Sequence, residues 1–246
     1  MTKILLGTTM LAGLLVAGVA QAADLKAPAY KAPQAPVYYN WSGFYLGVNA
    51  GYSSGNSDAD YVLNGAAITS FGLKPKGFIG GGQIGYRWQS GAIVFGIEAD
   101  AAWRNADDSA TFAFANGRDF TDISTEHKWL ATVRPVLGVA SNNWLFYATG
   151  GFAFGGVEHS VTERRPDTLG AIRTFGEDDT RTGWTVGGGI KTGFGQWTFG
   201  VEYLYVDLGS STVSAPAQTI VILFPPSKVS FDDTSHIVRA KLDFRF

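Results

Sequence analysis

The last twelve residues of the chain, SHIVRAKLDFRF, narrow its possible folds more than any other stretch. Even-numbered positions from 236 to 246 are mostly apolar, and odd-numbered positions from 237 to 245 are mostly charged. Side chains of a β-strand point alternately to opposite faces. The segment is therefore predicted to be a strand with one apolar and one charged face. The pattern continues to Phe246, so the end of the chain is expected to lie in a sheet.

Seven earlier segments alternate in the same way, at 43–52, 78–88, 93–103, 127–140, 145–155, 181–192 and 197–207. Short connections at 89–92, 141–144 and 193–196 take turns with long ones at 53–77, 104–126, 156–180 and 208–234. Segments of about ten residues, even in number, with short inner turns and long outer loops, are typical of outer-membrane barrels. We therefore expect an all-β fold: an eight-stranded antiparallel up-and-down transmembrane β-barrel with short periplasmic turns and four long outer loops.

Charged residues make up 16% of the chain, against about 25% in typical soluble domains. In the alternating segments they gather on the face that lacks aromatic side chains. Charges are expensive in lipid, so this face is expected to line the lumen. The predicted lumen network comprises Arg87, Glu98, Asp100, Lys128, Arg134, Lys191, Glu202, Arg239, Lys241, Asp243 and Arg245. Within it, Glu98 and Arg134 are expected at similar depth on neighbouring strands, and so are Glu202 and Lys241.

The tryptophans are expected to form two aromatic girdles, because Trp favours the interface between membrane and water. In an up-and-down strand order, the girdle at the short-turn end would contain Trp41, Trp88, Trp144 and Trp197. The girdle at the long-loop end would contain Trp103, Trp129 and Trp184. One residue does not suit a closed barrel: Pro135 lacks an N–H donor, so a bulge or local break is expected there.

The domain organisation is predicted from composition. Residues 1–22 have a basic start, an apolar run and a small-residue cleavage pattern, which indicates a signal peptide; a transmembrane anchor is the alternative. Residues 23–40 form a Pro-rich periplasmic leader with Lys-Ala-Pro repeats, and residues 41–246 form the barrel. The chain has no cysteine, so no disulfide supports it.

No motif in the chain indicates catalysis, a cofactor or a metal, so the protein is not expected to be an enzyme. A G-x-S-x-G match at 51–55 precedes a polar loop, and a G-x-G-x-x-G match at 80–85 opens a strand, so each lacks the helix its chemistry needs. The glycines are expected to relieve crowding instead. His127, His159 and His236 lack metal-ligand spacing, although a His–Ser dyad near the outer end stays open.

Two long connections, 104–126 and 156–180, are acidic. They are either a solvated surface or a site where divalent cations bridge to lipopolysaccharide phosphates. An apolar run at 220–224 is expected to extend a strand or to pack on loops. The net charge of −2 gives no reason to expect nucleic acid.

Several motifs carry a family resemblance: ADLKAPAY at 23–30, NWSGFYLGVNAGY at 40–52, WLATVRPVLGVA at 129–140, YATGGFAFG at 147–155, GWTVGGGI at 183–190 and VEYLYVDLG at 201–209. The chain resembles the small outer-membrane β-barrel ("porin family") proteins of alphaproteobacteria, which are distantly similar to the OmpA membrane domain and to opacity proteins. The resemblance implies export and insertion by the outer-membrane assembly machinery, with Leu242, Phe244 and Phe246 as the assembly signal. It implies no catalytic residue. Pro135 departs from it, because the family usually has a glycine nearby.

The expected location is therefore the bacterial outer membrane, and the expected function is structural: envelope integrity and surface display. A small pore for passive diffusion is the alternative, and an enzyme a more remote one. Expected partners are outer-membrane lipid, lipopolysaccharide and the assembly machinery, with peptidoglycan as a further option.

Overall fold

The computed structural model describes residues 39–113, 118–166, 171–215 and 226–246. These residues belong to one compact unit, Pro36–Phe246. The expected signal peptide and nearly all of the expected leader lie outside the described residues, as does the apolar run at 220–224. The described strands are β1 (Gly43–Leu63), β2 (Ala66–Leu73), β3 (Lys76–Ser90), β4 (Ile93–Ala113), β5 (Phe120–Ser141), β6 (Trp144–Arg165), β7 (Ala171–Phe194), β8 (Trp197–Ala215) and β9 (Ser227–Arg245).

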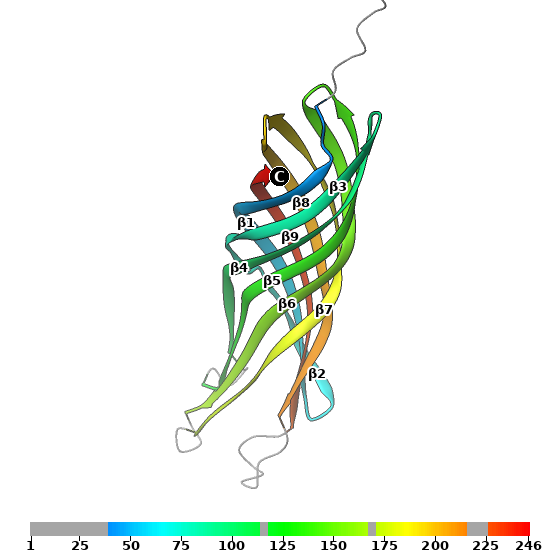
Figure 1. Cartoon of the computed structure of the whole chain (residues 1–246). Helices are drawn as coiled ribbons and strands as arrows, with labels where there is room; N and C mark the ends of the chain where they lie inside the picture. The colour runs from blue at the N-terminus through cyan, green and yellow to red at the C-terminus, as the bar shows by residue number, and fades with distance from the viewer. Residues whose placement is uncertain (1–38, 114–117, 167–170, 216–225) are drawn as a thin grey trace, which may run out of the picture. The chain divides into compact units, whose positions relative to one another are not determined.

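The strands form an antiparallel up-and-down ring, which confirms the expected fold class. From β3 to β9 each strand pairs with its neighbour in the chain, and β1 closes the ring by pairing with β3 and β9. Figure 1 shows the C-terminal end of β9 beside β1 at the top of the view, with β2 at the opposite end. Eight strands make the ring. The ninth, β2, pairs only with β1. It precedes β3 in the chain, is separated from it by Lys74 and Pro75, and lies in line with it along β1. Among the described residues, no helix is long and apolar enough to cross a membrane.

The short turns are where the sequence predicts them, but the assignment of four long loops is wrong. β5 and β6 have 22 residues and β7 has 24, about twice the 9–11 residues that a tilted strand needs to cross a bilayer. Most of the expected loops are strand because alternation continues through them. In β1, for example, Ala59 and Tyr61 are buried while Asp58 and Asp60 are exposed. Asn64-Gly65, with φ of 50° and 79°, is a type I′ hairpin signal that the loop assignment overlooked.

The two halves of the ring have opposite face chemistry. In the half near the short turns, Leu242 is 41% exposed on the outside while Asp243 is 1% exposed inside. In the outer half, Asp232 is exposed outside while Phe231 is fully buried inside. The inner half is therefore built for lipid outside and charge inside. The outer half is built for water outside, and its interior combines an apolar cluster with buried polar groups such as Asp233 and Glu163.

The outer half also separates into two sheets. The ladder between β7 and β8 stops at Trp184 and Asp207, although β7 pairs with β6 as far as Ala171. β4 pairs with β3 only as far as Asp107. One outer sheet therefore contains β4, β5, β6 and β7, and the other contains β8, β9, β1 and β2. Their facing sides share one apolar cluster: Ala59, Tyr61, Leu73, Val213, Val229 and Phe231 from one sheet, and Ile123 and Val161 from the other.

The break expected at Pro135 occurs on one side only. Pro135 pairs with Ile97 of β4, but on the β6 side the ladder has partners at Val133 and Val136 and none between them. The register is the same on both sides of this gap. Thr149 of β6 instead donates its hydroxyl to the Pro135 carbonyl at 2.8 Å. The missing N–H therefore interrupts the ladder without forming a bulge.

Candidate functional site

The interior of the inner half contains a dense ion-pair network. Its nine charged residues are each 5% exposed or less: the cations Arg87, Arg134, Lys191, Arg239 and Lys241, and the carboxylates Glu98, Asp100, Glu202 and Asp243. Buried charges of this kind are stable only when paired and hydrogen-bonded. Each carboxylate has at least two cationic partners, so the network satisfies this requirement.

Glu98 is one centre of the network. It lies directly opposite Arg134 on the neighbouring strand, and the Arg134 Nη2 to Glu98 Oε1 distance is 2.8 Å. Lys241 contacts the same oxygen, and the Tyr45 hydroxyl donates to Glu98 Oε2 at 2.8 Å. These partners come from β1, β5 and β9, so the carboxylate ties together strands on different sides of the ring.

Glu202 and Asp100 pair with Arg239 and with cations that also contact Glu98. Glu202 lies opposite Arg239, which donates from Nε at 2.9 Å, and Lys241 lies 3.4 Å away. Arg239 also donates from Nη1 to Asp100 at 2.8 Å. Arg134 contacts Asp100 at 2.8 Å and Glu202 at 3.4 Å. The two arginines therefore bridge three carboxylates on two strands.

Asp243 forms the centre nearest to the short turns. It accepts hydrogen bonds from Arg87 at 2.6 Å, Lys191 at 2.7 Å, Gln83 at 2.8 Å and Thr198 at 3.0 Å. The Arg87 guanidinium also lies 3.7 Å from the centre of the Tyr45 ring. This contact is a cation–π interaction, which links the layer to the Glu98 centre.

Inward-facing glycines leave room for the tyrosines of the network. A Cβ on Gly85 would lie 2.3 Å from the Tyr45 hydroxyl oxygen, and one on Gly189 would lie 2.8 Å from that of Tyr147. The two hydroxyls donate to Glu98 and Glu202. Gly85 belongs to the G-x-G-x-x-G match, so its steric role agrees with the crowding interpretation.

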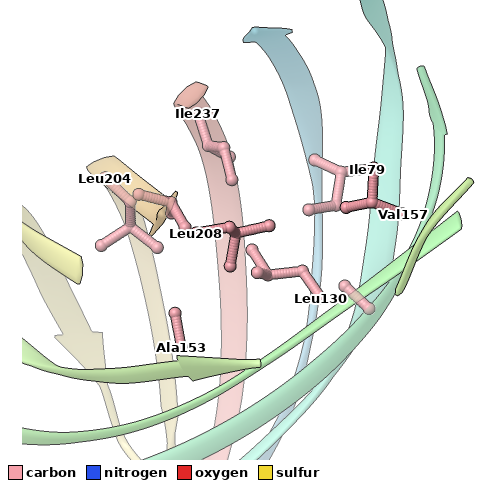
Figure 2. Close-up of a cluster of buried hydrophobic side chains, with 9 residues drawn as sticks. Ile79, Leu130, Ala153, Val157, Leu204, Leu208 and Ile237 are labelled. Carbon is pink, nitrogen blue, oxygen red and sulfur yellow. The ribbon is translucent and has the colours of Figure 1, made fainter. Parts of the chain in front are cut away.

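Apolar layers close the network at both ends. Toward the short turns, Trp41, Val94, Val136, Ala140, Leu145 and Tyr147 pack together. Toward the outer half lies a second cluster, and Figure 2 shows its side chains converging on the interior: Ile79, Ala102, Leu130, Ala153, Val157, Leu204, Val206, Leu208 and Ile237. The charged layer is thus enclosed by apolar layers on either side.

Three predicted site residues lie outside the positions that the sequence assigned to them. Lys128 is a bulged residue between His127 and Trp129, so it turns outward and pairs with Glu158, with 38% of its side chain exposed. Arg245 is half-buried at the short-turn end, 5.0 Å from the Tyr39 ring and outside the ion pairs. Trp41 is 1% exposed, because it shares the inward parity of Tyr45, so it does not belong to an outer girdle.

The remaining aromatic and terminal residues face outward. Trp88, Trp103, Trp144, Trp184 and Trp197 are 44–79% exposed, and Trp129 is half-buried. At the chain end, Leu242 and Phe246 are 41% and 69% exposed, and Phe244 packs against Trp197 at 4.9 Å between ring centres. The Phe246 N–H donates to the Phe44 carbonyl at 3.0 Å, so the last residue still pairs with β1.

A second polar layer lies beyond Trp103 and Trp129, and the sequence analysis did not anticipate it. Asp233 lies 3.1 Å from His159 and 3.6 Å from His127, and all three side chains are fully buried. Arg104 donates to Ser53 and Ser235 at 2.6 and 2.9 Å. The bulge at Lys128, which sets the parity of His127, is not visible in the alternation. Within the described residues no group of three acidic or histidine side chains, that of Asp233 included, is arranged so that it could hold a metal ion.

Burial shifts pKa values in this layer, and two groups show how it competes with neighbouring charges. Burial alone would raise the pKa of Asp233, but the neighbouring His127 and His159 imidazoles outweigh it and hold the pKa below its usual range. Burial lowers the pKa of His127, and Asp233 only partly opposes this effect. The layer therefore favours an ionised aspartate beside a neutral His127.

Comparison with known proteins agrees with this architecture. Residues 9–246 match the model of the "Outer membrane protein beta-barrel domain" family. The chain belongs to this family. It is 35% identical to the 31 kDa outer-membrane immunogenic protein of Brucella melitensis, over 92% of this chain and 93% of that protein. It is 31% identical to the 22 kDa outer membrane protein of Rhizobium leguminosarum bv. viciae, over 74% and 71%.

The fold also has solved counterparts. The outer membrane protein OprG from Pseudomonas aeruginosa superposes with a TM-score of 0.53 at 14% identity, covering 85% of this chain and 99% of that one. This likeness concerns the fold alone. The relatives and the family together place the chain in the bacterial outer membrane and confirm the resemblance to alphaproteobacterial barrel proteins.

Proposed function

We propose that this outer-membrane protein is a structural, non-conducting barrel that supports envelope integrity and displays its two outer sheets at the cell surface. The observation that carries the proposal is the enclosed ion-pair network. Its charged side chains have fixed partners, and the layers around Leu145 and Leu130 close it at both ends.

A diffusion pore is the competing function. Eight strands leave an interior that side chains just fill. A solute on the barrel axis would have to displace apolar side chains and separate buried pairs such as Arg239 with Glu202, which lie 2.8 Å apart. Breaking one buried pair costs about 3–5 kcal/mol, so passage through several of them is too slow for a pore.

We also propose that the protein has no catalytic activity. Among the described residues, His159 Nδ1 lies 3.0 Å from the Thr125 hydroxyl oxygen, and His236 Nδ1 lies 2.7 Å from the Tyr203 hydroxyl oxygen. The His159 pair is fully buried, so a lipid substrate has no approach to it. The His236 pair is exposed, but its hydroxyl belongs to a tyrosine and does not supply the serine of a His–Ser dyad.

The proposed partners follow from the outer surface. Asp107, Glu126, Glu158 and Asp178 lie side by side across four strands, just beyond the outer tryptophans. Like charges in such positions repel. Lys128 offsets part of the repulsion at Glu158 and Asp178, and divalent cations shared with lipopolysaccharide phosphates would relieve the rest. We further propose that Leu242, Phe244 and Phe246 address the chain to the assembly machinery. A peptidoglycan contact through the leader would involve residues outside the described part.

Planar-bilayer recordings on the refolded full chain test the main proposal. We expect no stable openings above those of bilayers that received the same detergent without protein. Heat-modifiable gel mobility of the same sample verifies that the barrel has folded. Stable single-channel openings from folded protein would replace the structural function with the pore.

A further inference from the structure

The seam between β7 and β8 leaves one strand edge without a neighbour among the described residues. β7 pairs with β6 all the way from Gly183 to Ala171. On its other side, the ladder with β8 begins only at Trp184. Among the described residues, positions 174–182 therefore have no ladder partner on this side, beyond the level of the outer tryptophans.

A backbone irregularity in β8 keeps this seam open. Gly209 has φ of +69°, and the β8–β9 register shifts between Asp207 and Ser210. Leu208 turns inward there and is 3% exposed, so close to β6 that a Cβ on Gly155 would lie 2.7 Å from the Leu208 Cδ1 atom. β8 thus leaves β7 and crosses toward β6. The opening is a property of the chain path.

The exposed edge is strongly acidic. Glu177, Asp178, Asp179 and Thr180 are all exposed, although Glu177 and Asp179 share the inward parity of the buried Arg181. Over these residues both faces of the strand are open to water. Glu177 lies 4.0 Å from Arg181, and Asp178 lies 3.6 Å from Lys128, so these carboxylates have only long or exposed ion pairs.

The second seam, between β2 and β4, has features that hinder pairing with another chain. β2 has only 8 residues, and Lys74 and Pro75 follow it. The Lys74 N–H donates to Asp108 at 2.7 Å across this seam. Short strands, proline and charged side chains, lysine above all, are the usual devices that prevent an edge from pairing with another chain. Residues 174–182 contain neither lysine nor proline. Their exposed charges are acidic, so they repel a like-charged edge but attract a cationic strand.

We propose that the outer edge of β7, residues 174–182, binds an extended cationic segment of another polypeptide by strand addition. Main-chain hydrogen bonds would supply affinity, and lysine or arginine side chains of the partner would contact Glu177, Asp178 and Asp179. A second copy of the chain does not fit this edge, because antiparallel pairing of two β7 edges would bring two acidic runs together. This binding role goes beyond the structural function proposed above.

The test uses the full barrel in phosphatidylcholine nanodiscs and a fluorescent ten-residue peptide of alternating lysine and valine. Binding is measured by anisotropy, and amide hydrogen exchange reports protection. We expect saturable binding with new protection in residues 174–182. The variant Glu177→Gln/Asp178→Asn/Asp179→Asn is expected to weaken binding by about tenfold or more, since it removes three charges at the contact.

Two controls separate strand addition from general charge attraction. The variant Asp58→Asn/Asp60→Asn/Asp232→Asn changes the net charge equally, on the exposed faces of β1 and β9, and is expected to leave affinity within about twofold. A peptide of the same sequence with alternate backbone nitrogens methylated keeps its charge but cannot form the ladder, and it should not protect β7. Equal binding of the methylated peptide, or equal weakening by both triple variants, would overturn the proposal.

Discussion

Replacing Glu98 by glutamine tests whether the lumen network stabilises the barrel. Glu98 accepts hydrogen bonds from Arg134, Lys241 and Tyr45, and its side chain is 2% exposed. Glu98→Gln keeps the shape but removes the charge. Five buried cations would then face the three carboxylates that remain: Asp100, Glu202 and Asp243.

The expected loss is large because the buried cations would outnumber the buried carboxylates further, and Lys241 would keep only Glu202, 3.4 Å away. Leaving a buried charge without its partner costs about 3–5 kcal/mol of unfolding free energy. The double variant Glu98→Gln/Lys241→Met also removes one of the stranded cations, and it should recover at least about 1 kcal/mol of that loss. A matched surface change, Glu158→Gln, removes the ion pair with Lys128. The Lys128 side chain is 38% exposed and the Glu158 side chain is 43% exposed. This change should cost no more than about 1 kcal/mol.

Urea unfolding of the barrel in phosphatidylcholine vesicles, followed by tryptophan fluorescence, measures all three changes. We expect the midpoint to fall sharply for Glu98→Gln, to rise again for the double variant, and to stay near the parent value for Glu158→Gln. If Glu98→Gln unfolds within about 0.5 kcal/mol of the parent, the network is not a stabilising element and the reasoning fails.

Three further predictions concern single residues. Gly85→Ala should lower the unfolding free energy by about 1–3 kcal/mol, because its Cβ would lie 2.3 Å from the Tyr45 hydroxyl oxygen. Gly82 faces outward, and a Cβ there would lie 3.5 Å from its nearest neighbouring atom, so Gly82→Ala should be near neutral in the same urea assay. Equal losses for the two variants would refute the crowding argument. Deleting Phe246 should reduce the amount of protein in outer-membrane fractions, while the purified protein still refolds in detergent. The control is Phe146→Ala, which removes another exposed phenylalanine. Unchanged levels in the membrane fraction would contradict the proposed assembly signal. Acidification should destabilise the outer half, because burial lowers the pKa of His127 in the folded state. Below about pH 6.5 the unfolded chain therefore binds more protons than the folded chain, and stability falls as the pH falls. Hydrogen exchange of the outer strands at pH 7.5 and 5 should show this loss of stability. His127→Gln should diminish the loss, and His236→Gln, at an exposed position, should not. An unchanged pH response in His127→Gln would contradict the prediction.

Local alternation was sufficient to predict the inner half of the barrel. Leu46, Val48 and Tyr52 are outside and Asp243 and Lys241 are inside, as their parity indicates. The pattern is reliable there because each position meets either lipid or a closed interior, and the two environments tolerate opposite kinds of side chain.

The same reasoning failed where solvent replaces lipid. Past Trp103 the outside is polar, and much of the inside is apolar, although it encloses buried polar groups such as Asp233 and Glu163. The alternation therefore continues with its chemistry largely reversed, and the strand extensions are mistaken for loops. Composition favoured this error, because residues such as Ser109, Thr111 and Ser124 are typical of both loops and water-facing strands.

The sequence by itself determined the class of fold, the number of strands in the ring, the short turns and the two faces of the inner half, because a period of two is a local property. Only the tertiary structure decided which charges pair, where parity reverses and where the ring opens. Glu98 and Lys241 are 143 positions apart and meet across the interior. Lys128 turns outward at a bulge, and β8 leaves β7 after Gly209. A bulge adds one residue to one strand, and its effect on parity depends on the strands beside it.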